Sequence, residues 1–247
     1  MRTWFRNRLD PGERYGLRLS LLAIALFLVA VPFGWLLNQV ARKGSLVRSD
    51  TAAARHLNDW ANDTPAFVDV LKVVTFFGAP VWCYLLVVPT ALLLWKRHLP
   101  RLAVFLLATT VGGGLLNTAV KLAVNRPRPS LLDPVATAHG RSFPSGHAMS
   151  STIVYGALLL VVLPWVTPAR RRLAVAGAVV MVLMVGFSRL ALGVHYLSDV
   201  VAGYVLGCAW LAASTAAFGT WRVERAREPG EPPDPPHDMV PGSARRQ

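Results

Sequence analysis

Six long apolar stretches, separated by short polar ones, dominate the pattern of hydrophobic and polar positions along the chain. None of them contains Asp, Glu, Lys, Arg or His, and most reach the roughly 20 residues that span the hydrocarbon core of a bilayer. The fifth is the shortest, and snorkelling of Arg172 or continuation of the helix past Ser188 would lengthen it. The pattern predicts an all-α membrane protein with six transmembrane helices in a bundle. The stretches are Leu19–Leu37, Val73–Trp95, Leu102–Val120, Ala148–Ala169, Leu173–Ser188 and Val200–Trp221.

The longest connection, residues 38–72, separates the first two predicted helices and is too polar to cross a bilayer. Within it, Asp50 is a candidate cap for a short helix that runs to Trp60. Asp63-Thr64-Pro65 predicts a second helix start, because proline is favoured at the first helical position. We therefore expect short interfacial helices between helices one and two, with Trp60 and Phe67 at the depth of the lipid headgroups.

The two ends of the chain differ from its apolar centre in composition. Residues 1–18 are rich in arginine and predict a basic cytoplasmic lead-in to an uncleaved first helix. Residues 222–247 are charged and rich in proline, which predicts a disordered cytoplasmic tail. Between these ends, residues 19–221 are predicted to form a single six-helix membrane domain.

The chain is 53% hydrophobic and 16% charged, with a net charge of +13. Its basic residues flank the apolar stretches, which favours orientation signals and contacts with anionic lipid over a nucleic-acid partner. Sixteen of the 26 Lys and Arg residues fall at the amino end, in 96–101, in 170–172 or in the tail, all on one side of a six-helix topology. The positive-inside rule then places both termini in the cytoplasm and the opposite side outside the plasma membrane.

Three polar segments share that opposite side: one follows the third predicted helix, one precedes the fourth, and one joins the fifth to the sixth. In the last of these, His195 and Asp199 are four residues apart at the start of a helix and are expected to share one face. A carboxylate in that place can accept the Nδ1–H and leave Nε2 as a nucleophile. The alternative is an i,i+4 hydrogen bond without catalysis, and the pair alone does not decide between the two.

The other two segments supply groups that bind anions. Ser145-Gly146 offers free backbone N–H groups at the positive end of a helix dipole, and His147 follows in the first turn as a candidate general acid. Three cations, Lys121, Arg128 and Arg189, would repel one another unless an anion lay between them. Each cation alone is more often a topology signal, but together these groups predict a pocket for a phosphoryl group.

Metal and nucleotide chemistry are disfavoured by the pattern of polar residues. Paired carboxylates and histidine clusters at ligand spacing are lacking, and the candidate site is mostly cationic, which repels a divalent ion. Gly112-Gly113-Gly114 lies within an apolar stretch and has no following Lys-Ser or Lys-Thr, which excludes a Walker loop. The sequence therefore predicts no metal and no cofactor.

Three motifs together resemble the signature of the type 2 phosphatidic acid phosphatase superfamily: Lys121-x6-Arg128-Pro129, Pro144-Ser145-Gly146-His147 and Ser188-Arg189-x5-His195-x3-Asp199. This family contains lipid phosphatases, undecaprenyl-diphosphate phosphatases, phosphatidylglycerophosphate phosphatases, glucose-6-phosphatase and vanadium haloperoxidases. The motifs cover residues 121–199, and the six-helix arrangement extends the resemblance to about 19–221. Every signature position is present in order.

The resemblance implies a role for each of these residues. His195 would attack phosphorus and carry a phosphohistidine, Asp199 would orient it, and His147 would protonate the leaving group. Water would then release phosphate without a metal. The residues implied to hold the phosphoryl oxygens are Lys121, Arg128, Ser145, Gly146 and Arg189.

The sequence thus favours a metal-independent membrane phosphatase acting on a lipid phosphate monoester or diphosphate, of the phosphatidic acid, phosphatidylglycerophosphate or undecaprenyl diphosphate class. Its expected partners are that lipid and the bilayer. A lipid phosphotransferase on the same scaffold shares the first half-reaction and stays open. A non-enzymatic anion transporter would explain the helices and the cationic pocket, but not the pairing of His195 with Asp199 opposite His147. A haloperoxidase is disfavoured in so apolar a chain.

Overall fold

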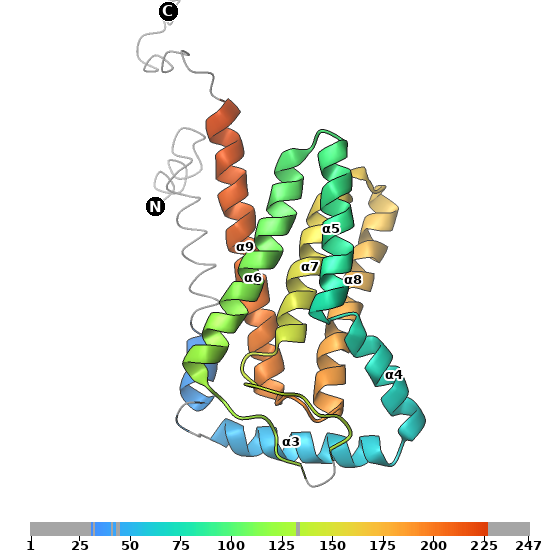
Figure 1. Ribbon diagram of the computed structural model, residues 1–247, viewed down its shortest axis with the longest axis vertical. Helices are drawn as coiled ribbons and strands as arrows, with labels where there is room; N and C mark the ends of the chain where they lie inside the picture. Colours follow the sequence, from blue (N-terminus) through green and yellow to red (C-terminus); the bar gives the residue numbers. More distant parts are fainter. Residues whose placement is uncertain (1–30, 32, 41, 43–44, 132–133, 227–247) are drawn as a thin grey trace, which may run out of the picture.

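Every regular element in the part of the chain that the computed structural model describes is helical, as predicted from the apolar pattern. The described residues are 31, 33–40, 42, 45–131 and 134–226. Residues 33–40 are helical and precede the labelled elements of Figure 1. Those elements are α3 (Ser45–Asn62), α4 (Pro65–Phe76), α5 (Pro80–Lys96), α6 (Pro100–Val124), α7 (Gly146–Val162), a 3₁₀ turn (Leu163–Trp165), α8 (Pro168–Ala191) and α9 (Leu197–Ala226).

Five helical stretches among the described residues are long and apolar enough to cross a membrane. The first predicted helix lies mostly outside the described residues, as do the amino-terminal lead-in and most of the predicted tail. α9 continues into the predicted tail as far as Ala226. The short fifth apolar stretch becomes α8, which extends past both of its ends. The five stretches are Pro65–Lys96, Pro100–Val124, Gly146–Trp165, Pro168–Ala191 and Leu197–Phe218.

The second predicted helix is divided in two. Its apolar stretch, Val73–Trp95, predicts one continuous helix, whereas a turn separates α4 from α5. Pro80 begins α5, and proline is favoured there because the first turn of a helix needs no N–H from it. α4 therefore runs obliquely away from the axis of α5 (Figure 1).

Two predicted helix starts in the long connection have different outcomes. The start at Asp63-Thr64-Pro65 is confirmed, because Thr64 is the N-cap of α4 and Pro65 is its first residue. The interpretation of Asp50 as a helix cap is wrong. α3 begins upstream at Ser45, and Asp50 lies within the helix with only 2% of its surface exposed. Its carboxylate instead accepts hydrogen bonds from residues of other elements.

α7 lies at the centre of the bundle, where it packs against α5, α6, α8 and α9. Glycines allow α9 to approach it closely. A Cβ atom at Gly203 would lie 2.7 Å from the carbonyl oxygen of Ser145, and one at Gly207 would lie 2.9 Å from Cβ of Thr152. The small-residue face of α9 is therefore a contact within this bundle.

The three polar segments meet at one end of the bundle (Figure 1). The α6–α7 loop, the start of α7 and the α8–α9 turn all lie there, and α3 crosses the same end. The α5–α6 and α7–α8 turns lie at the opposite end (Figure 1). Alternation of helix direction thus brings together polar residues that are far apart in the sequence.

Candidate active site

His195 lies in the turn between α8 and α9 and is 1% exposed. Its Nδ1 is 3.4 Å from Oδ2 of Asp199. The prediction that the two share one helical face is wrong in detail, because α9 begins only at Leu197. Asp199 instead lies in the first turn of α9, where Oδ2 accepts a hydrogen bond from the N–H of Tyr196 at 2.9 Å. This resembles one half of a capping box, and it turns the carboxylate back toward His195.

The partners of His195 define its tautomer. Nη1 of Arg128 lies 3.3 Å from Nε2, and because a guanidinium can only donate, Nε2 accepts and Nδ1 carries the proton toward Asp199. Burial lowers the pKa of His195 to about 4, even though the hydrogen bond and charge of Asp199 raise it. The imidazole is therefore neutral near pH 7, with its Nε2 lone pair facing Arg128.

The start of α7 is joined to the start of α9 by a backbone hydrogen bond. Ser145 is the N-cap of α7, and its N–H donates to the backbone oxygen of Asp199 at 2.9 Å. Its hydroxyl is buried and has no hydrogen-bond partner among the described residues. A Cβ atom at Gly146 would lie 3.3 Å from Oδ1 of Asn117 and 3.7 Å from Nζ of Lys121. A glycine there keeps the first amides of α7 open toward the lysine.

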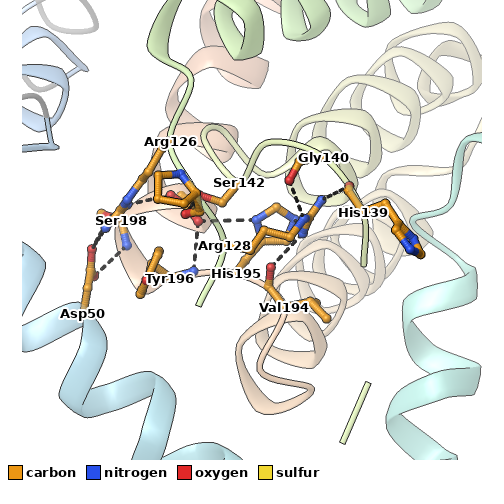
Figure 2. A network of polar contacts seen from close by, with 12 residues as sticks. Asp50, Arg126, Arg128, His139, Gly140, Ser142, Val194, His195, Tyr196 and Ser198 are labelled. Atoms are coloured by element: carbon orange, nitrogen blue, oxygen red, sulfur yellow. Dashed lines mark hydrogen bonds and ion pairs between the residues drawn. The ribbon is translucent and has the colours of Figure 1, made fainter. Parts of the chain in front are cut away.

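Two arginines complete the cationic part of the site. Arg189, in the last turn of α8, donates from Nη1 to Oγ1 of Thr75 at 2.8 Å. Its Nε is buried without a partner in the described part of the chain, a costly state that an anion would relieve. Burial also lowers the pKa of Arg128 in the α6–α7 loop. Arg128 donates to the backbone carbonyls of His139, Gly140 and Val194, at 3.2, 3.2 and 2.7 Å (Figure 2).

A cavity of about 530 Å³ collects the predicted residues around one space. His147 and His195 both line it, so two imidazoles from distant parts of the chain border the same volume. Gly146 lines it as well, whereas Ser145 and Asp199 are fully buried and do not. The cations that line the cavity are Lys121, Arg128 and Arg189.

The wall of the cavity becomes apolar toward α5 and α6. Tyr84, Val111 and Leu115 line it there, and the same residues are 45%, 45% and 68% exposed on the bundle. Side chains that contribute to both surfaces connect the cavity with the outside of these two helices.

Sequence reasoning missed a group of buried charges next to His195. Arg126 is 6% exposed and forms ion pairs with Asp199 and with Asp50 of α3 (Figure 2). Its place in Arg126-Pro127-Arg128-Pro129 is the one signal in the sequence, since both arginines share a segment stiffened by proline. Nothing near Asp50 indicates a partner that lies 76 residues further along the chain.

The chemistry of the lining suits an anion better than a cation. Within the described ranges, no group of three or more His, Cys, Asp or Glu side chains is placed to hold a metal ion. The exposed histidines His56, His98 and His139 do not line the cavity. Three cations and the open amides of α7 together form a set of hydrogen-bond donors for a phosphoryl group, beside the lone pair on Nε2 of His195.

Comparisons with known proteins agree with this chemistry. The PAP2 superfamily matches residues 102–222 of the chain. Phosphatidylglycerophosphatase B of Bacillus subtilis (strain 168) is 30% identical over 148 residues, which are 58% of this chain and 71% of the relative. Lipid A 1-phosphatase of Rhizobium johnstonii is 32% identical over 121 residues, which are 45% of this chain and 46% of the relative.

A solved structure shares the helical arrangement. The crystal structure of a transmembrane PAP2 type phosphatidylglycerolphosphate phosphatase from Bacillus subtilis superposes with a TM-score of 0.68 at 25% sequence identity. The superposition covers 80% of this chain and 98% of that one. The segment that matches the family also contains every predicted site residue, from Lys121 to Asp199. On these grounds the chain belongs to the PAP2 superfamily of lipid phosphatases.

Proposed function

We propose that the protein is an integral membrane phosphatase that cleaves a lipid phosphate monoester or diphosphate through a phosphohistidine, without a metal. The observation that carries this proposal is the single cavity lined by His147, His195 and three cations. A phosphoryl group in that cavity would have a nucleophile and an acid within the same space. It would also give a partner to Nε of Arg189, a buried group of a lining residue that lacks one among the described residues.

In the first half-reaction, Nε2 of His195 forms a bond to phosphorus while the bond from phosphorus to the lipid oxygen breaks. Arg128 leaves Nε2 beforehand, because charged phosphoryl oxygens are stronger acceptors for its guanidinium. Asp199 keeps the Nδ1–H in place and stabilises the positive charge that develops on the ring. His147 donates a proton to the departing oxygen, so the lipid leaves as an alcohol or, from a diphosphate, as a monophosphate.

In the second half-reaction, water attacks phosphorus and the bond to Nε2 breaks. His147, now neutral, takes a proton from the water, and both imidazoles return to their starting states. Throughout, the phosphoryl oxygens carry negative charge that fixed cations and helix amides stabilise without reorganising. The lining residues proposed for this role are Lys121, Arg128, Gly146 and Arg189. Ser145, which does not line the cavity, would contribute as the N-cap that positions the first amides of α7.

A lipid substrate is supported by the apolar side of the cavity. Tyr84 and Leu115 belong both to its wall and to the exterior of α5 and α6, where acyl or prenyl chains of the bilayer would lie. A lipid could place its phosphate among the cations while its chains stay in the membrane. Relatives named for phosphatidylglycerophosphate and lipid A make these classes, with phosphatidic acid and undecaprenyl diphosphate, the first to assay.

We further propose a six-helix membrane domain over residues 19–221, between a cytoplasmic lead-in (1–18) and a cytoplasmic tail (222–247) that is disordered beyond the end of α9 at Ala226. Amphipathic α3 and the oblique α4 would lie in the interface. The site would face the outside of the plasma membrane, since exposed basic residues of the turns at 96–101 and 170–172 lie at the end of the bundle away from the cavity.

The test is phosphate release from dioleoyl phosphatidic acid and from undecaprenyl diphosphate in detergent containing EDTA. We expect activity in the wild type, loss of it in His195→Ala, and full activity in His56→Ala, a matched exposed histidine of α3. Activity that survives in His195→Ala, or that disappears with EDTA, would overturn the proposed mechanism. Adding an unphosphorylated lipid acceptor tests the phosphotransferase alternative, which requires phosphate to appear on that lipid.

A further inference from the structure

Three buried polar residues that do not line the cavity lie behind the carboxylate of Asp199, which faces His195. They are Asp50, Arg126 and Ser198 (Figure 2). Arg126 donates from Nη1 to Oδ1 of Asp199 at 2.6 Å and from Nη2 to Oδ2 of Asp50 at 2.9 Å. The backbone N–H of Ser198 donates to Oδ1 of Asp50 at 3.1 Å, and its hydroxyl donates to Oδ2 of the same carboxylate. These contacts connect α3, the α6–α7 loop and the first turn of α9.

Arg126 is shared between two carboxylates that are almost fully buried. A buried ion without a partner costs several kcal/mol. Loss of the Arg126 guanidinium would leave both Asp50 and Asp199 in that state, so it is expected to destabilise the fold. The planar guanidinium has donors that point to both acids at once, which a lysine ammonium cannot reproduce. Cζ of Arg126 also lies over the ring of Tyr196, 4.0 Å from its centroid, and this cation–π contact restricts the orientation of the guanidinium.

Asp199 is consequently held at both of its oxygens. Oδ1 accepts from Arg126, while Oδ2 accepts from the backbone of Tyr196 at 2.9 Å and faces Nδ1 of His195. A carboxylate fixed in this way cannot rotate away from the imidazole. The orientation of the ring therefore depends on a chain of contacts that begins on α3.

We propose that Arg126 and Asp50 are positioning residues for the nucleophile: Asp50 orients Arg126, Arg126 orients Asp199, and Asp199 holds the imidazole with Nε2 toward the cavity. This inference rests on the proposed function, in which His195 attacks phosphorus. Neither residue lines the cavity, so neither is placed to bind the phosphoryl group. Their contribution is to the chemical step, whereas the binding of phosphate depends on other residues.

The experiment compares three variants of the full chain in detergent, with dioleoyl phosphatidic acid as substrate and inorganic phosphate as the inhibitor that reports anion binding. Arg126→Gln removes the shared cation, and Arg126→Lys keeps its charge without the fork. The double variant Asp50→Asn/Arg126→Gln removes one charge of each sign, so the net charge of the buried group is unchanged. Arg141→Gln is the control, because Arg141 lies in the same loop and donates to a neutral partner among the described residues, Oδ1 of Asn125.

We expect kcat to fall about 100-fold in Arg126→Gln and in the double variant, the loss typical of a misplaced reacting group. Arg126→Lys is expected to lose about 10-fold, as outer partners of a site residue often do. Inhibition by inorganic phosphate stays at the wild-type level in all three, and Arg141→Gln behaves as the wild type. The double variant is decisive, because it removes the contact that orients Asp199 without changing the net charge of the buried group.

Wild-type kcat in the double variant would overturn the proposal, since Arg126 would then serve only to neutralise Asp50. Weaker phosphate inhibition in proportion to kcat would overturn it too, because it indicates a damaged anion site. The proposal also fails if the control folds and none of the three variants does. His195→Ala is measured in parallel: if it stays active, the proposed function fails as well, whereas an inactive His195→Ala beside fully active Arg126 variants removes the positioning role alone.

Discussion

In the proposed mechanism, the charge of the buried His195 imidazole sets the acid side of the pH profile. Burial lowers the pKa of His195 to about 4 from an ordinary value of 6.5, so in the free enzyme Nε2 keeps its lone pair down to about that pH. We predict that kcat/KM, which reports the free enzyme, falls only as the pH approaches 4. The acid limb of kcat should lie at higher pH, because a bound phosphoryl anion favours the charged ring and raises its pKa.

Asp199→Asn provides the comparison for these pH profiles. The carboxylate raises the pKa of His195, so its loss lowers that pKa and should move the acid limb of the residual kcat/KM to lower pH. The ionisation of the substrate is the same for both proteins, and the difference between the profiles therefore belongs to the enzyme. An acid limb near 6.5 that Asp199→Asn does not move would contradict a neutral, buried His195 as the nucleophile.

The polar residues that line the cavity could be predicted from sequence, whereas the buried charges behind them could not. His147 and His195 are recognisable because each lies a fixed distance from a helix start, and such spacing is local information. Asp50 and Arg126 are single charges in polar segments, where solvent exposure is the ordinary expectation. Their pairing exists only because α3 crosses the end of the bundle, a long-range feature that no local pattern contains.

Among the helices, the α7–α9 contact places a steric requirement on the site, because α9 approaches the backbone at the start of α7. A Cβ atom at Gly203 would lie 2.7 Å from the carbonyl oxygen of Ser145 and 3.0 Å from Cβ of Ala148, at the start of α7. We predict that Gly203→Ala destabilises the protein by about 1–3 kcal/mol through overpacking. It should also lower phosphatase activity, because the backbone that it displaces is that of Ser145, the N-cap of α7 beside the proposed anion site. Thermal unfolding in detergent and phosphate release measure the two effects.

Gly177→Ala on α8 is the matched control for this substitution. A Cβ atom there would have no neighbour within 4 Å, and alanine is favoured over glycine within a helix by about 0.5–1 kcal/mol. Its melting temperature should therefore equal or exceed that of the wild type, with activity unchanged. Equal behaviour of the two variants would show that the close approach of α9 to α7 is not needed.

The apolar pattern predicts which helices exist better than it predicts where they break. Window composition finds α6, α7, α8 and α9, because an apolar stretch of membrane-spanning length has few other stable structures in lipid. It misses the turn between α4 and α5, since apolar residues continue through it and only Pro80 marks the new start. The direction in which α4 leaves the bundle is a matter of packing, which composition does not contain.

For the molecule as a whole, the uneven distribution of charge predicts an orientation in the membrane. The turns at 96–101 and 170–172 present exposed Lys and Arg at the end opposite the cavity, with no acidic residue among them. Translocating such turns is disfavoured, so they are expected to stay in the cytoplasm while the cavity faces outward. A lipid phosphatase oriented in this way would act on the outer leaflet.

Single cysteines on the two sides test this orientation. In a background with Cys83 and Cys208 replaced by alanine, Thr137→Cys places a thiol on the exposed α6–α7 loop and Thr167→Cys places one at the start of α8. We expect a membrane-impermeant maleimide to label Thr137→Cys in intact spheroplasts and Thr167→Cys only after permeabilisation. The reverse pattern would contradict the predicted orientation, because it would put the cavity on the cytoplasmic side. Labelling of both variants before permeabilisation would indicate leaky spheroplasts, and the protein without cysteines is the control for labelling at other residues. Because both positions are exposed and neither lines the cavity, phosphatase activity should survive each change and show that the labelled protein is folded.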